Sequence, residues 1–143
     1  MSSEADPEND RDALIEQNKQ LLSAFADWLA AAGLKHTTIR QHCSNIDFYV
    51  NHYLLYYDAV AARDGSDQVA EFLGDWFIRK AMWSNAASIK SNAASLKKFY
   101  TFLSEQGMVE PAALANLKTT IKQDMPDWLA SMQRYMDLAE DAW

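Results

Sequence analysis

Apolar residues recur every three to four positions along most of the chain, which is the spacing of one face of an α-helix. This pattern predicts helices over residues 10–33, 37–57, 69–77, 84–107, 111–122 and 127–143. Gly33 and Gly107 are expected to end two of them, because glycine adopts the left-handed conformation that closes many helices. Pro126 is expected to break or restart the last helical stretch. We therefore predict an all-α fold, a compact bundle of four to six helices.

The segment 84–107 is the helix around which we expect the others to be organised. Ser84 and Asn85 supply N-cap chemistry at its start. Its predicted inward stripe consists of Ile89, Ala93, Leu96, Phe99, Tyr100 and Leu103.

The outward side of the same segment carries small side chains and lysines. The pattern Ser-Asn-Ala-Ala-Ser-apolar-Lys occurs at 84–90 and again at 91–97, which stacks Ala87 over Ala94 and Lys90 over Lys97, with Lys98 close by. Such a smooth positive face suits close approach to phosphate groups. A solvated face built from good helix formers explains it equally well, so both interpretations stay open.

The helix predicted over 37–57 also carries candidate binding residues. We expect Thr37 to cap it, and its start exposes Thr37, Thr38 and Arg40, whose donors could bind a phosphate; capping alone would also explain the threonines. One face carries Ile39, Cys43, Ile46, Val50, Tyr53, Leu54 and Tyr57. Phe48 and Leu55 project from the other side, so we expect this helix to be covered on two sides.

The remaining helices have candidate core residues at the same spacing. They are Leu14, Leu21, Phe25, Trp28 and Leu29 in the first helix, Val69, Phe72, Leu73, Trp76 and Phe77 in the third, and Trp128, Leu129, Met132, Tyr135 and Met136 in the last. Residues 1–9 lack apolar anchors, so we predict a disordered acidic tail there, a helical domain over 10–125 and a C-terminal helix over 126–143 that either links or packs back.

Charge is distributed unevenly along the 143 residues, whose net charge is −7. Residues 1–16 hold six acidic residues and one basic residue, and residues 124–143 hold five and one. Residues 76–104 hold Arg79, Lys80, Lys90, Lys97 and Lys98 with no acidic residue. A positive stripe that could meet nucleic acid is therefore expected on an acidic protein, whose acidic ends could also compete for that stripe.

Candidate catalytic groups are sparse. His36, His42 and His52 are spaced six and ten residues apart, which does not stack two imidazoles as a helical metal pair would. Cys43 lies on an apolar stripe and is expected to be a core residue; as the single cysteine it fits a reducing cytoplasm. We expect no metal, no cofactor, no membrane partner and no enzymatic activity.

Three segments in order resemble the core-binding domain of tyrosine recombinases, the phage-integrase family. They are FADWLAAAGLKHTTIRQHCSNIDFYV, VAEFLGDW and NAASLKKFYTFLSEQGMVE, within a likeness that spans about residues 20–125. The resemblance implies a SAM-like fold that clamps duplex DNA, chiefly through phosphates. Carried over to this chain, it implies contacts from Thr37, Thr38, Arg40, Lys90, Lys97 and Lys98, with Arg79 and Lys80 as further basic candidates.

The catalytic half of that family has no counterpart in this sequence. No segment matches its arginine, lysine, histidine-x-x-arginine and nucleophilic tyrosine, so we expect a fragment of a larger integrase or a stand-alone relative. Two hypotheses follow. The first is a non-catalytic module that binds duplex DNA, weakly when alone. The second is a protein-interaction module that binds a recombinase catalytic domain or a second copy of itself through the C-terminal helix.

Overall fold

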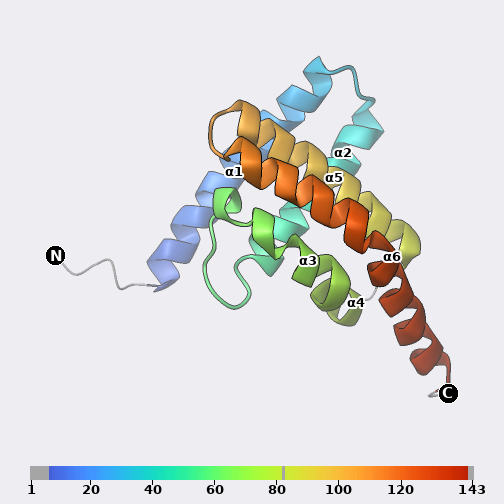
Figure 1. Ribbon diagram of the computed structural model, residues 1–143. Coiled ribbons are helices and arrows are strands. Elements are labelled where there is room, and N and C mark those ends of the chain that lie inside the picture. The colour runs from blue at the N-terminus through green and yellow to red at the C-terminus, as the bar shows by residue number, and fades with distance from the viewer. Residues whose placement is uncertain (1–6, 82, 142–143) are drawn as a thin grey trace. The chain divides into compact units, whose positions relative to one another are not determined.

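The structure is a computed structural model that describes residues 7–81 and 83–141. The described residues form helices and connecting turns without a β-strand, which confirms the predicted all-α fold (Figure 1). The chain divides into two compact units, Met1–Gly65 and Ser66–Trp143. Among the helices of the described ranges, none combines the length and apolar character needed to cross a bilayer.

The first unit is built from α1 (Pro7–Ala31) and α2 (His36–Asp47), which continues as the π-helical turn η2 (Phe48–Tyr53). Gly33 between them has φ +87°, the left-handed conformation expected at a helix end. The unit's fully buried side chains include Phe25, Leu29, Ile46, Tyr49 and Val50. Residues 1–6 of the predicted disordered tail lie outside the described residues, and residues 7–9 are helical rather than disordered because Pro7 opens α1.

The turn η2 changes which side chains of this segment are buried. A π-turn uses more residues per turn than an α-helix, so side chains after it are rotated away from the 3.6-residue pattern. Tyr49, the second residue of η2, is fully buried, whereas Tyr57, which we predicted to share a face with Ile46 and Val50, is 62% exposed because the helix ends at Tyr53, before the predicted end at residue 57. Leu55 is buried, as expected for a helix covered on two sides.

Polar side chains of α1 satisfy backbone carbonyls at and just after η2. The buried Asn18 donates from Nδ2 to the Val50 carbonyl at 3.2 Å and to Asn51 Oδ1 at 2.8 Å. Arg11 Nη2 donates to the Leu55 carbonyl at 2.7 Å. Carbonyls near the end of a helix lack intrahelical donors, so these contacts replace missing hydrogen bonds. Tyr49 also donates from its hydroxyl to the Gly65 carbonyl at 2.6 Å.

The second unit begins with a nearly continuous helical segment. It comprises η4 (Ser66–Gln68), α3 (Val69–Glu71), the π-turn η5 (Phe72–Trp76) and α4 (Phe77–Lys80), after the short η3 (Ala62–Asp64) of the first unit. Its predicted apolar set of Val69, Phe72, Leu73, Trp76 and Phe77 is buried, which confirms that prediction.

Helices α5 (Ala86–Glu105) and α6 (Pro111–Asp141) form an antiparallel pair (Figure 1). At the start of α5, Asn85 Oδ1 accepts from the Ser88 amide and Ser88 Oγ accepts from the Asn85 amide, each at 2.8 Å. This reciprocal capping box confirms the predicted N-cap chemistry. Gly107, with φ +77°, follows the other end. Pro111 occupies the first helical position of α6, where its missing N–H costs nothing.

Helix α6 runs through Pro126 without a break, so the predicted break or restart there is wrong. The domain boundary that we placed at residue 126 also falls inside this helix. Leu117 and Ile121 before the proline and Trp128 and Met132 after it are all buried. These four share one helical face, so the packing of that face offsets the roughly 3 kcal/mol that an internal proline costs.

The helical segment of residues 66–80 packs closely against α6 at Gly74. A Cβ atom on Gly74 would lie 2.8 Å from Cδ1 and 2.9 Å from Nε1 of the Trp128 indole. Only a residue without a side chain fits this contact. Beyond Met132, α6 is exposed: Tyr135 and Met136, which we predicted to be buried, are 42% and 45% exposed, because α6 has 31 residues and its partner α5 only 20.

Candidate nucleic-acid interface

Helix α5 separates a buried half from a charged half. All six residues of the predicted inward stripe are at most 2% exposed, which confirms that stripe. The buried arc is wider than the stripe, since Asn92, Ser95 and Phe102 are also buried. Asn92 is held by a hydrogen bond from its Nδ2 to the Ser88 carbonyl at 2.8 Å. Because Asn92 and Ser95 are polar, the spacing of apolar residues did not predict their burial.

Three lysines lie on the opposite side of α5. Lys90, Lys97 and Lys98 are all exposed. Lys90 and Lys97 are seven residues apart, close to two full turns, so they lie on one side of the helix and roughly 10 Å apart along its axis. No carboxylate of the described residues forms an ion pair with any of the three. Their ammonium charges are therefore available to an anionic ligand.

The surface around these lysines is formed by short side chains. Ala87, before Lys90, is exposed, and Ala94, between Lys90 and Lys97, is partly exposed. The hydroxyl of Thr101, one turn after Lys97, donates a hydrogen bond to the Lys97 carbonyl at 2.7 Å. No long side chain separates the lysines from an approaching backbone, and no acidic residue occurs in α5 before Glu105.

The basic residues at the end of α4 are in a different situation. Arg79 donates from Nε and Nη2 to the two carboxylate oxygens of Asp75, each at 2.9 Å. This hydrogen bond lowers the pKa of the Asp75 carboxyl, with a smaller contribution from the charge of Arg79. Asp75 thus neutralises the guanidinium at neutral pH. Lys80, the last residue of α4, is exposed.

The candidate residues of α2 belong to the first unit, whereas those of α4 and α5 belong to the second. The N-cap is Lys35, which makes no side-chain capping bond, so the prediction that Thr37 caps this helix is wrong. The helix begins one residue earlier than predicted, which places Thr37 inside its first turn. Thr37, Thr38 and Arg40 are exposed, and the first turn contains no acidic residue.

Histidine and cysteine do not form a reactive centre in the parts of the chain that the structure describes. His42 is buried, and no group of three or more metal-ligating side chains comes together there. Cys43 is partly buried, and burial raises the pKa of its thiol. A raised pKa disfavours the reactive thiolate, in keeping with a packing role.

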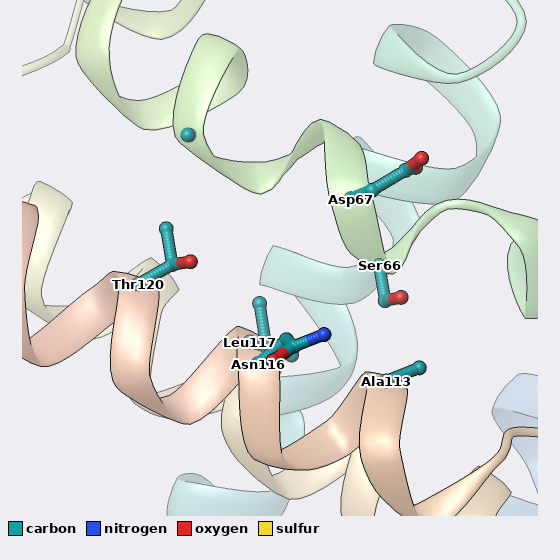
Figure 2. A pocket seen from close by; sticks show the side chains of 7 residues that line it. Ser66, Asp67, Ala113, Asn116, Leu117 and Thr120 are labelled. Carbon is teal, nitrogen blue, oxygen red and sulfur yellow. The ribbon is translucent and has the colours of Figure 1, made fainter.

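A small pocket of about 220 Å³ lies between η4, α3 and the first half of α6 (Figure 2). Its lining residues are Ser66, Asp67, Ala70, Ala113, Asn116, Leu117 and Thr120. The Asp67 carboxylate points away from α6 in Figure 2. The lining contains neither a basic side chain nor a histidine, so the pocket offers no cationic group to a phosphate.

Two exposed features of the second unit were not predicted as parts of a site. Lys118 and Lys122 in the first half of α6 are exposed, and their four-residue spacing, which places both on one side of a helix, could have identified them. Trp83, in the turn before α5, is 57% exposed. A single aromatic residue in a turn has no periodicity, so the apolar pattern could not indicate its exposure.

Comparisons of the chain with protein-family models, with curated proteins and with solved structures found no match. The resemblance to the integrase core-binding domain, including its SAM-like fold, therefore stays a prediction.

Proposed function

We propose that the chain is a non-catalytic DNA-binding module of the tyrosine-recombinase type, which contacts duplex phosphates through Lys90, Lys97 and Lys98. The main support is that these three lysines are exposed on one helix and have no carboxylate partner among the described residues. The first turn of α2, with Thr37, Thr38 and Arg40, supplies further phosphate contacts in this proposal.

Phosphate contacts make affinity depend on salt. Each neutralised phosphate releases condensed counterions, so three contacts give a slope of roughly −3 for log affinity against log salt. Binding by the isolated module is weak, because few contacts are made. Fluorescence anisotropy of a labelled duplex between about 50 and 200 mM salt measures both the affinity and the slope.

The decisive variant is Lys90→Glu with Lys97→Glu, which should abolish binding at about 50 mM salt. The matched control is Lys19→Glu with Arg63→Glu, which changes net charge equally at two exposed residues of the first unit. The control should retain most of the affinity. Absence of wild-type binding at low salt, or an equal loss in both double variants, would contradict the proposal.

The end of α6 supports a second candidate, a protein-interaction module. Tyr135, Met136 and Leu138 are 42%, 45% and 69% exposed, on a helix whose earlier apolar residues are buried. Exposed apolar clusters often mark interfaces. Analytical ultracentrifugation distinguishes the candidates: a dimer that is insensitive to salt, ignores DNA and is lost in Tyr135→Ser with Met136→Ser would favour this one.

A further inference from the structure

The turn between α4 and α5 presents an indole ring to solvent. Trp83 is 57% exposed, yet its ring packs edge-on against the buried Phe77, with centroids 6.3 Å apart and an interplanar angle of 82°. The contact fixes one edge of the indole and leaves much of the ring accessible. An exposed aromatic surface forgoes the stabilisation that burial would give, so its position is not explained by the packing of the core.

Hydrogen bonds hold the backbone on both sides of Trp83. The Ser84 amide donates to the Ala81 carbonyl at 3.1 Å, and Ser84 Oγ donates to the Ile78 carbonyl at 3.2 Å. The capping box of Asn85 and Ser88 follows directly. The indole therefore starts from a backbone that is already ordered, which reduces the entropy lost when a ligand stacks on it.

Basic residues precede and follow Trp83 in the sequence. Lys80, the last residue of α4, lies three residues before Trp83 in the sequence and is exposed. On α5, Ser88 Oγ donates to the Trp83 carbonyl at 3.5 Å, and the exposed Lys90 follows two residues later in the sequence. Residues 76–104 contain no acidic residue. A flat aromatic surface flanked by positive charge is what a base and its neighbouring phosphates require.

We propose that Trp83 stacks on an unpaired base of the DNA whose phosphates the α5 lysines bind. This inference rests on the proposed function and specifies its ligand: DNA with an unpaired base at a gap, bulge or strand end. In an uninterrupted duplex each base is already covered on both faces by its neighbours. An unpaired base can offer one face to the indole.

The test compares a fully paired duplex with the same duplex carrying one bulged base, both followed by fluorescence anisotropy. Wild type should bind the bulged probe about tenfold tighter, within the range that base–aromatic stacking provides. Trp83→Ala should remove this preference and leave both the duplex affinity and the salt slope unchanged. Trp83→Phe should keep part of the preference. Tyr57→Ala, which removes a 62% exposed aromatic residue of the first unit, should keep all of it.

A second readout does not depend on affinity. Stacking should quench tryptophan fluorescence on the bulged probe, and Trp83→Phe should abolish the quenching. Equal wild-type affinity for the two probes, or a preference that persists in Trp83→Ala, would overturn the inference while leaving lysine-dependent duplex binding intact. If the folded protein binds neither probe at low salt, both the inference and the proposed function fail.

Discussion

Helix α5 and the last turns of α6 carry the same kind of amphipathic pattern, yet only α5 buries its apolar stripe. Phe99 and Leu103 of α5 are fully buried, whereas Tyr135 and Met136 of α6 are nearly half exposed. The polar sides differ too, because α5 presents three lysines and residues 124–143 are predominantly acidic. Periodicity therefore selects the side of a helix that can be buried, and the length of its packing partner decides how much of that side is buried. The two candidate functions follow this division, with DNA assigned to α5 and protein partners to the end of α6.

The largest expected effect is at the centre of the buried stripe. Phe99→Ala removes a side chain with 0% exposure, so the free energy of unfolding should fall by about 3–5 kcal/mol in urea denaturation. Lys98→Ala, the adjacent exposed residue, is the control and should stay within about 0.5 kcal/mol of wild type. Similar losses in both variants would mean that the two sides of α5 are not distinct.

Two methionines one turn apart locate the point at which the α6 stripe leaves the core. Met132 is 2% exposed and Met136 is 45% exposed. Met132→Ala should cost about 2–5 kcal/mol, whereas Met136→Ala should change stability by less than about 0.5 kcal/mol. Thermal or urea unfolding of the two variants measures the contrast. A large loss in Met136→Ala would indicate that the end of α6 is covered in solution, as self-association would cause.

Substitution of Gly74 tests how tightly α6 is packed just before its buried face ends at Met132. Gly74→Ala places a methyl group against the Trp128 indole and should cost about 1–3 kcal/mol by overpacking. Trp128→Leu in the same chain should relieve part of that cost, so a double-mutant cycle should give a favourable coupling energy. Additive losses would show that the methyl group and the indole do not compete for space.

The smallest expected effect concerns Arg79, whose guanidinium is paired with the Asp75 carboxylate. Asp75→Asn should release the Arg79 guanidinium, raise DNA affinity severalfold at low salt and steepen the salt slope by up to about 1. Anisotropy titrations measure both quantities. Asp67→Asn removes the same charge from the same helical segment and should leave the slope unchanged. If both variants behave alike, Arg79 is not oriented toward DNA.

The sequence predicted the helices and most of the core because both depend on local periodicity. The inward stripe of α5 and the apolar set around Phe72 follow the 3.6-residue repeat and are buried as predicted. Leu54 and Leu55 after η2 are buried as predicted, but Tyr57 is exposed because the helix ends at Tyr53, and the apolar spacing gave no signal of that earlier end. The break at Pro126 was predicted from the free-energy cost of a proline inside a helix. The packing of Trp128 and its neighbours offsets that cost, so the helix continues.

The candidate site was predicted less completely. Exposure of Lys90, Lys97 and Lys98 followed from helical phase and agrees with the structure. The pairing of Arg79 with Asp75 was available from their four-residue spacing but was not used. The cap of α2 was misplaced because threonine is a good N-cap residue and lysine is not, yet Lys35 occupies the position. The position of the Trp83 ring depends on its contact with Phe77. That contact forms only in the folded turn, so the sequence pattern could not predict it.

The continuity of α6 through Pro126 has a consequence for its motions. Proline carries no amide hydrogen, so the Lys122 carbonyl lacks the donor that the regular helix would supply four residues later. Opening this turn breaks one hydrogen bond fewer than opening any neighbouring turn. The amide protons just after the proline should therefore exchange with solvent deuterium sooner than those around Leu117, while the buried Trp128 and Met132 beyond the proline limit how far the helix can bend there.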